Sequence, residues 1–271
     1  MESEKVVNIL IYFLLIVLSI LICVPLFYLI RLSTIKTYIV AITDYFAPIN
    51  LWNYITLVSG GFFLRWMLNS IIISTSVTIL NVLIVSAAGY ALSQKPPFSN
   101  NLFALTLLSM SIPGFIRLVP LYILFAKMNL TNTYFGIIFA MLGTPFSVFL
   151  MRQFFISIPI DYRESALLDG CSEWNVITKI YLPIAKPALI VVALTEFINS
   201  WNEFTIPLVM VSTSEMATVP LGIATYITGL MGVDWGIASA ASVIGSLPTI
   251  ILFIMLSEHY MRGLVTLALK R

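Results

Sequence analysis

Long apolar stretches alternate with shorter polar segments along all 271 residues of the chain. A helix needs about 20 mostly apolar residues to cross the hydrocarbon core of a bilayer, because each residue adds about 1.5 Å. The pattern therefore predicts an all-α polytopic membrane protein with six transmembrane helices in one domain, 1–271. The six predicted spans are residues 6–30, 66–92, 102–126, 134–151, 188–211 and 237–256.

The third of these stretches is interrupted by Pro113, Arg117 and Pro120. Proline removes a backbone donor and clashes with the preceding turn, so this stretch predicts a broken helix. Within a bilayer, the backbone groups that such a break frees need a cavity or a protein partner.

Composition supports the membrane interpretation. Ordinary soluble domains carry about 25% charged residues, whereas this chain is 10% charged and 60% apolar. These proportions exclude a soluble globular domain and a disordered chain. The net charge of +2 provides no basic field for nucleic acid. We therefore expect the lipid bilayer as the surroundings and no nucleic-acid partner.

The distribution of Lys and Arg predicts the orientation. Six spans place both termini on one side, and most of the Lys and Arg residues outside the spans fall on that side, in the segment 152–187 and in both terminal segments among others. Basic residues are concentrated in cytoplasmic loops. We therefore expect a multi-pass protein of the bacterial plasma membrane with both termini in the cytoplasm.

The longest polar segment on the predicted cytoplasmic side is 152–187. It predicts a short helix that begins at Asp161, where an acidic first turn suits the helix dipole, and ends at Gly170. Tyr162, Ala166 and Leu167 give this helix an apolar face. Two interpretations stay open, namely a surface helix on lipid headgroups and a docking element whose apolar face enters the groove of a cytosolic partner.

Three groups of residues in this loop resemble a family motif. Glu-Ser-Ala at 164–166, Gly170 and Ile-x-Leu-Pro at 180–183 resemble the E-A-A…G…I-x-L-P loop of bacterial ABC importer permeases. Ser165 stands where that motif usually has alanine, and serine is small enough to keep the helix packing.

The resemblance extends over nearly the whole chain, which is similar to the smaller, six-span permease subunit of maltose-type carbohydrate importers. After its R-G-L segment the family often has glycines, where this chain has Leu267 and Arg271. The segments that carry the resemblance are LRWMLNS (64–70), IPGFIRLVPLY (112–122), LTNTYFG (130–136), FLMRQFF (149–155), SWNEF (200–204) and RGL (262–264).

This resemblance implies a function and a set of partners. The chain would form the translocation pathway of an ATP-driven sugar importer with a second permease, expected to be a different chain. Two copies of an ABC ATPase would bind ATP and Mg²⁺, and an extracytoplasmic solute-binding protein would deliver the solute. The helix 161–170 would be the coupling helix that docks on the ATPase. The implied coupling residues are Asp161, Glu164, Ser165, Ala166, Asp169, Gly170, Ile180, Leu182 and Pro183.

The chain lacks motifs for chemistry of its own. A P-loop needs G-x-x-x-x-G-K-[ST], and no Gly-Lys dipeptide occurs in the sequence. The single histidine, His259, is not part of an H-E-x-x-H motif, and Cys23 and Cys171 lie far apart. We therefore expect a transport subunit with no catalytic residue, no metal site and no cofactor on this chain.

Ionisable and amide side chains recur at helical spacing on one face of the fifth predicted span. An ionisable group inside a span costs about 2.5–3.5 kcal/mol on insertion scales, so each one requires an explanation. One interpretation is a pathway wall, in which carboxylates and amides bind sugar hydroxyls and an indole stacks on the sugar. The other is hydrogen bonding between helices. The candidate pathway residues are Glu196, Asn199, Trp201, Asn202, Glu203 and, in the third span, Arg117.

Two further alternatives stay open. Arg117 fits either a gating role or a salt bridge to Glu196 or Glu203. The chain as a whole fits a stand-alone secondary transporter with Glu196 and Glu203 as proton-coupling groups, or a membrane assembly protein without a solute path. Neither of these two explains the match to the E-A-A motif.

Overall fold

The computed structural model describes residues 2–36, 47–94, 96–228 and 234–269, and every regular element in these ranges is a helix. The chain divides into two compact units. The first comprises Met1–Leu64 with Gly222–Leu247, and the second comprises Arg65–Leu221 with Pro248–Arg271. An all-helical architecture suits a bilayer, because a helix satisfies its backbone hydrogen bonds internally.

The first unit contains α1 (Glu2–Ser33), α2 (Trp52–Ser59), most of α13 (Val219–Thr228) and the first part of α14 (Trp235–Leu269). The amide of Asn53 in α2 is buried and donates to the carbonyls of Ser33 (3.0 Å) and Ile35 (2.7 Å) at the end of α1. A Cβ added at Gly236 would lie 2.7 Å from that amide nitrogen. The asparagine thus satisfies carbonyls that the helix end leaves unpaired, and the small glycine lets α14 approach it.

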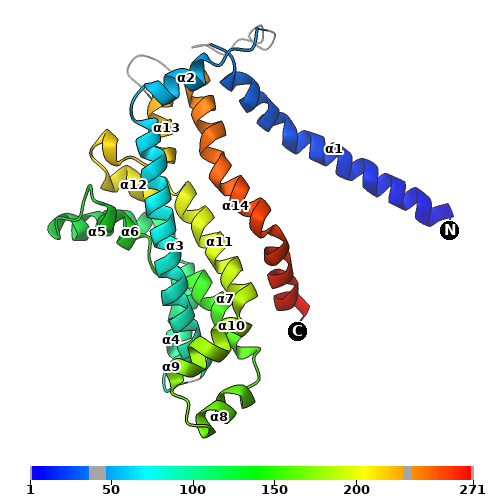
Figure 1. Ribbon diagram of the computed structural model, residues 1–271, viewed down its shortest axis with the longest axis vertical. Coiled ribbons are helices and arrows are strands. Elements are labelled where there is room, and N and C mark those ends of the chain that lie inside the picture. Colours follow the sequence, from blue (N-terminus) through cyan, green and yellow to red (C-terminus); the bar gives the residue numbers. More distant parts are fainter. Residues whose placement is uncertain (1, 37–46, 95, 229–233, 270–271) are drawn as a thin grey trace. The chain divides into compact units, whose positions relative to one another are not determined.

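The second unit is a bundle built around α3, α7 and α11, which run side by side in Figure 1. A Cβ added at Gly89 of α3 would lie 2.8 Å from the Cβ of Met151 in α7, so the glycine permits the close crossing of these two helices. The helices of this unit before the loop are α3 (Phe63–Ser93, from Arg65 on), α4 (Ser99–Met110), α5 (Gly114–Lys127), α6 (Tyr134–Ala140) and α7 (Pro145–Ile156), and those after it are α11 (Lys186–Asn202) and α12 (Thr205–Met210), with the 3-10 turn η3 (Ser214–Met216).

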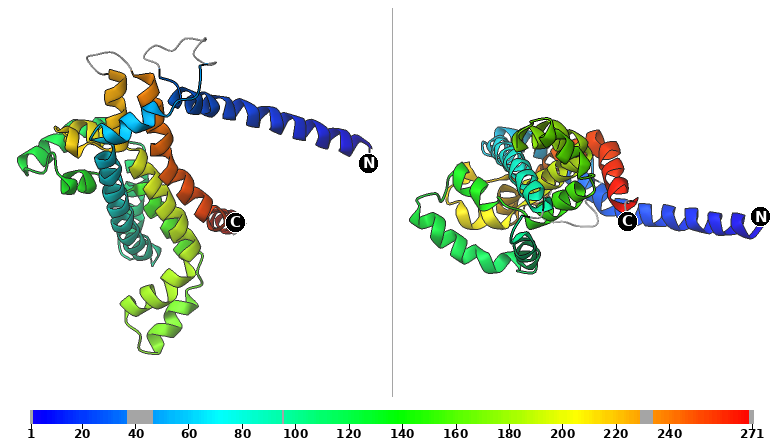
Figure 2. Two further views of the ribbon diagram at one scale, coloured as in Figure 1. Left: turned by 45° about the horizontal axis from the view of Figure 1, so that its top comes forward. Right: turned by 90° about the horizontal axis from the view of Figure 1, so that it is seen from below.

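Within the described ranges, three helices are long and apolar enough to span a membrane alone, with candidate spans Val7–Ser33, Phe63–Ser93 and Trp235–Ser257. Up to six spans result if each of three bent helix pairs is one span. These pairs are α4 with α5 (102°), α6 with α7 (56°), and Glu173–Ile184 with α11 (80°). Figure 2 shows how sharply α5 leaves the direction of α4.

Three of the predicted spans have breaks, and the predicted fourth span is divided between α6, which ends at Ala140, and α7, which begins at Pro145. The predicted third span is divided between α4 and α5 immediately before Gly114, and Pro113 precedes the first residue of α5, as the proline pattern indicated. In the predicted fifth span α11 ends at Asn202, Glu203 is extended, and α12 follows. The Glu203 carboxylate accepts from the backbone N–H groups of Thr205 (2.7 Å) and Ile206 (3.0 Å), which starts a new helix at this point.

Two apolar cores stabilise the second unit, and α3 contributes to both. One core joins α3 and α7 to the segment 158–192, and its largest fully buried members are Val85, Met151, Phe155, Val176 and Tyr181. The other joins α3 to α5, α6 and α12, with Ile73, Val77, Phe125, Ile137 and Met210. The loop is therefore packed on the same long helix as the pair α5 and α12.

Candidate functional site

The predicted loop helix is α8 (Asp161–Leu168), which begins at Asp161 as the sequence indicated and has Asp169 as its C-cap, with Gly170 directly after it. Gly170 has a φ of +83°, the left-handed region that glycine adopts without strain. Its N–H donates to the carbonyl of Leu167 (3.0 Å), and the N–H of Cys171 donates to that of Ala166 (3.0 Å). These two bonds satisfy carbonyls at the helix end and turn the chain sharply.

The side chains of α8 divide between a buried anchor and an exposed surface. Ala166 is the buried residue of the helix and belongs to the core around α3 and α7. Leu168 is 88% exposed and Tyr162 is 54% exposed. The predicted apolar face is thus divided, because Ala166 points to the bundle while Tyr162 points away from it. The polar coupling residues Asp161, Glu164, Ser165 and Asp169 are exposed as well.

The rest of the loop returns to the bundle through α9 (Glu173–Val176), the π-helical turn η2 (Ile177–Tyr181) and α10 (Leu182–Ile184). Ile180 and Leu182 are half-buried and pack on the core, whereas Pro183 is exposed. Tyr181 is fully buried. The Ile-x-Leu-Pro segment therefore anchors the loop, while the segment at 161–169 presents its side chains outward.

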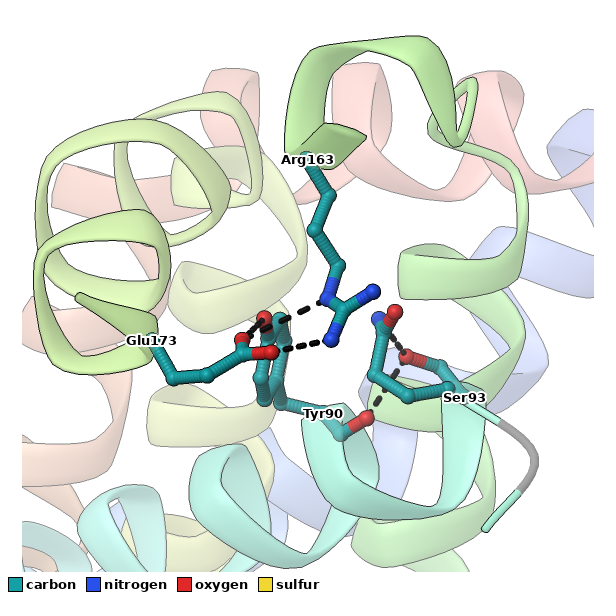
Figure 3. A network of polar contacts seen from close by, with 5 residues as sticks. Tyr90, Ser93, Arg163 and Glu173 are labelled. Carbon is teal, nitrogen blue, oxygen red and sulfur yellow. Dashed lines mark hydrogen bonds and ion pairs between the residues drawn. The ribbon is translucent and has the colours of Figure 1, made fainter. Parts of the chain in front are cut away.

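A polar network joins the loop to α3, and sequence reasoning missed it (Figure 3). The hydroxyl of Tyr90 donates to Oε2 of Glu173 at 2.6 Å, and Arg163 of α8 forms an ion pair with the same carboxylate. The hydrogen bond to Glu173 raises the pKa of the Arg163 guanidinium above its usual value. The signal was weak in the sequence, because Tyr90 lies 83 residues from Glu173 and no local pattern pairs them.

The structure places Glu196 at the centre of a buried cluster between helices. The residue is 3% exposed. Its carboxylate accepts from the amide of Asn81 (2.8 Å), from the hydroxyl of Thr144 (2.9 Å) and from the hydroxyl of Ser147. These contacts join α3, α7 and α11. Among the two interpretations of Glu196, they correspond to hydrogen bonding between helices.

The other candidate pathway residues of α11 separate into two groups. Trp201 is buried, and its ring stacks on Phe197 with centroids 5.7 Å apart, so the indole is not presented to a solute. Asn199 and Asn202 are exposed, and the Asn202 amide donates to the carbonyl of Ile198 at 2.9 Å. The acceptor oxygen of Asn202 and the amide of Asn199 form no hydrogen bond among the described residues.

Arg117 and Glu203 line two adjoining open cavities within the second unit, of about 360 Å³ and about 220 Å³. Asn199, Asn202 and the edge of Glu196 line the first, and Phe115 lines the second. No ion pair joins Arg117 to Glu196 or Glu203 among the residues that the structure describes. These cavities offer a guanidinium, amides and an aromatic ring, a combination suited to a hydroxylated solute.

The described part of the chain contains no group of three or more His, Cys, Asp and Glu side chains that could hold a metal ion.

A family model described as "Binding-protein-dependent transport system inner membrane component" matches residues 80–260. The chain belongs to this family. The match includes the helices that surround Glu196, the loop with α8 and most of α14. This permease is accordingly a multi-pass inner-membrane component of a binding-protein-dependent ABC importer. It is a non-catalytic transport subunit, and in this family ATP binds separate ATPase subunits.

Named relatives and solved structures agree with the family. The permease is 35% identical over 212 residues to the arabinooligosaccharides transport system permease protein AraQ of Halalkalibacterium halodurans, covering 78% of this chain and 76% of the relative. It is 34% identical over 224 residues to the trehalose/maltose transport system permease protein MalG of Thermococcus litoralis, covering 80% of each chain. In fold it is similar to a chain of a bacterial ABC transporter involved in the import of the acidic polysaccharide alginate, with a TM-score of 0.85, 19% identity and coverage of 96% of this chain and 98% of that one.

The family assignment selects the importer hypothesis over a proton-coupled secondary transporter and over an assembly protein without a solute path.

Proposed function

We propose that this permease imports carbohydrate, that it forms the pathway with a second and different permease, and that α8 docks on one of two ATPase subunits. The observation that carries the docking proposal is the divided surface of α8. The helix buries one alanine, which holds it in place. It exposes Leu168 at 88%, so an apolar contact area stays free for a partner. Large apolar side chains exposed together mark interaction sites on protein surfaces.

The coupling residues then have distinct roles. Glu164, Ser165 and Asp169 lie on the exposed side with Asp161 and contact the ATPase, while Ala166 anchors the helix. Gly170 provides the turn, and Ile180, Leu182 and Pro183 connect the helix to α11. Docking at this loop requires it to be cytoplasmic, with both termini on the same side and six spans close to the ranges predicted from the sequence.

Carbohydrate is the solute class that the cavities and the relatives support. The relatives AraQ and MalG are named for arabinooligosaccharides and for trehalose and maltose. The first cavity has one guanidinium, that of Arg117, beside the carboxylates of Glu196 and Glu203. It therefore has no excess positive charge that would select an anion, and its hydrogen-bonding groups suit a neutral sugar. The extracytoplasmic binding protein that delivers this sugar belongs to the same proposal.

Gentle solubilisation of native membranes and affinity purification of the permease test the assembly. We expect a P-loop ATPase and a second permease to be recovered with it. For the docking site, Glu164→Cys is introduced into a chain whose Cys23 and Cys171 are replaced by serine, and cross-linking to the ATPase is followed. Lys179→Cys, exposed on the same loop but outside α8, is the matched control.

Recovery of the permease without an ATPase would refute the proposal. Efficient cross-linking from position 179 with none from position 164 would refute it as well. The solute class is tested in proteoliposomes that contain the purified complex and its binding protein. Uptake of neutral oligosaccharides that depends on ATP is expected, and exclusive uptake of an anionic solute would refute the assignment to neutral sugars.

A further inference from the structure

Glu173 connects three helices through one carboxylate, as Figure 3 shows. Its Oε2 accepts from the hydroxyl of Tyr90 in α3 (2.6 Å) and from Nε of Arg163 in α8 (3.3 Å). Its Oε1 forms the ion pair with Nη2 of Arg163. The carboxylate itself belongs to the first residue of α9. The bond between Tyr90 and Glu173 joins α3 to α9, and the Leu92 carbonyl of α3 also accepts from Nε of Arg152 in α7 (3.3 Å).

Tyr90 is a firm attachment point for this network. It is 8% exposed, and its ring packs edge-on against Tyr181 (centroids 4.9 Å apart) and Phe155 (6.0 Å). Tyr181 belongs to the π-helical turn and Phe155 to α7. A displacement applied to the Tyr90 hydroxyl therefore reaches a packed aromatic cluster, and such a cluster moves as a unit because it has no room to deform.

The helix α8 has few other attachments. Ala166 is its buried side chain, with Leu167 half-buried beside it. Short segments with little buried apolar surface have low local stability and move easily with respect to their support. The covalent chain connects α8 onward to α11. Apart from the packing of Ala166 and Leu167 on the core, its connection to α3 is the polar network of Arg163, Glu173 and Tyr90.

We propose that Arg163, Glu173 and Tyr90 are positioning residues that transmit displacement of α8 to α3, so that ATPase movement reaches two helices of the bundle rather than one. This inference rests on the proposed docking of α8. It goes further, because it assigns the mechanical connection to residues outside the E-A-A motif. The three residues touch neither ATP nor solute.

The test uses the whole importer in proteoliposomes, with its binding protein, and measures both ATP hydrolysis and sugar uptake. Tyr90→Phe removes one hydroxyl from a buried ring, and Glu173→Gln removes the charge from the shared carboxylate. Each is expected to raise the ATP hydrolysed per sugar taken up by about tenfold, since a hydrogen bond to a charged group is lost. Tyr122→Phe, an exposed tyrosine of α5, and Lys179→Gln, an exposed charge of the loop, are the matched controls and should leave the ratio unchanged.

Reversing the ion pair provides the second measurement. Arg163→Glu and Glu173→Arg should each raise the ratio, and the double variant should restore much of the wild-type value because the pair is re-formed. Cross-linking from Glu164→Cys to the ATPase is followed in every variant and should stay unchanged. A role confined to folding would instead lower assembly, hydrolysis and uptake together at a constant ratio.

The two proposals fail in different ways. An unchanged ratio in Tyr90→Phe, or no rescue in the double variant, overturns the transmission role while wild-type cross-linking leaves docking intact. Absence of cross-linking in the otherwise wild-type chain overturns docking, and the transmission role with it.

Discussion

Two glutamates of the same unit show how differently this permease uses a carboxylate. Glu196 is 3% exposed and accepts from Asn81, Thr144 and Ser147 between α3, α7 and α11. The side chain of Glu173 is 50% exposed and joins Arg163 to Tyr90 at the edge of the loop. The first carboxylate is almost fully buried between helices, at the border of a cavity, and it stabilises the bundle. The second connects a lightly anchored helix to that bundle and contributes little to stability, since exposed ion pairs are worth about 0–1 kcal/mol.

The comparison shows that burial distinguishes contacts that hold helices together from contacts that allow a segment to move. Buried polar groups are costly to leave unpaired, so the Glu196 cluster resists rearrangement. The region around α8 can shift at low cost, because most of its side chains already lie in solvent. A permease that changes conformation needs both a rigid bundle and a movable contact.

Glu196→Ala has the largest expected effect and is the strongest test of this contrast. The change removes the acceptor of two buried hydroxyls and the nearest acceptor of the Asn81 amide, which keeps the Met141 carbonyl at 3.3 Å. We therefore expect the free energy of unfolding to fall by about 3 kcal/mol. Thermal unfolding of the purified permease in detergent measures the loss. Glu196→Gln keeps a carbonyl acceptor in the same volume and should lose less. Full stability together with abolished uptake in Glu196→Ala would instead mark the residue as a solute contact.

Leu168→Asp changes the exposed surface of α8. It should leave the purified permease as stable as the wild type, within about 0.5 kcal/mol. Its leucine is 88% exposed, so nothing inside the chain depends on it. A charge in a docked apolar contact should weaken ATPase binding by about 2 kcal/mol, or about thirtyfold. Recovery of the ATPase during affinity purification measures the loss, and Leu168→Met is the control. Undiminished recovery with aspartate would place the contact elsewhere.

Gly170→Val tests whether the backbone conformation after α8, rather than the space around it, requires glycine. A Cβ at this position meets nothing within 4 Å, but the φ of +83° disfavours a branched side chain by about 1–2 kcal/mol. We expect ATP hydrolysis to be uncoupled from uptake while the complex still assembles. Gly170→Asn is the control, because asparagine tolerates left-handed angles. Normal transport by the valine variant would show that this turn has no part in coupling.

Arg117→Ala has the smallest expected effect and concerns the cavities. Arg117 is exposed and forms no ion pair among the described residues, so stability should not change. Loss of one hydrogen bond to a sugar, about 1 kcal/mol, should raise the KM for uptake about fivefold. Lys127→Ala, an exposed residue at the end of α5, is the control. Equal KM values for the two variants would remove Arg117 from the pathway.

Local signals made part of the structure predictable. The start of α8 at Asp161 and its end before Gly170 follow from an acidic first turn and from the backbone freedom of glycine. The break before α5 follows from Pro113. Each of these depends on neighbours along the chain, which a sequence displays directly.

Other features could not be predicted from the sequence, because they depend on residues that lie far apart along the chain. The spacing of Glu196, Asn199 and Glu203 predicted one polar face, but Glu203 caps α12 after a break that the helical pattern did not reveal. Trp201 was a candidate for stacking on a sugar, yet its ring packs on Phe197. Which way each side chain points was decided by how α11 ends and by what packs against it.

The sequence by itself determined an all-helical membrane protein, the positions of its apolar stretches and the loop that carries the E-A-A motif. A bilayer favours this outcome, because a helix satisfies its backbone hydrogen bonds internally and apolar stretches of about 20 residues are long enough to span the hydrocarbon core. The tertiary structure alone decided that Asn81 and Ser147 meet Glu196, that Gly89 meets Met151, and that Tyr90 meets Glu173. Lipid is as apolar as the helices themselves, so the hydrophobic pattern does not specify which faces pack together. Close packing and hydrogen bonds between helices select those faces. These contacts form only when the helices come together.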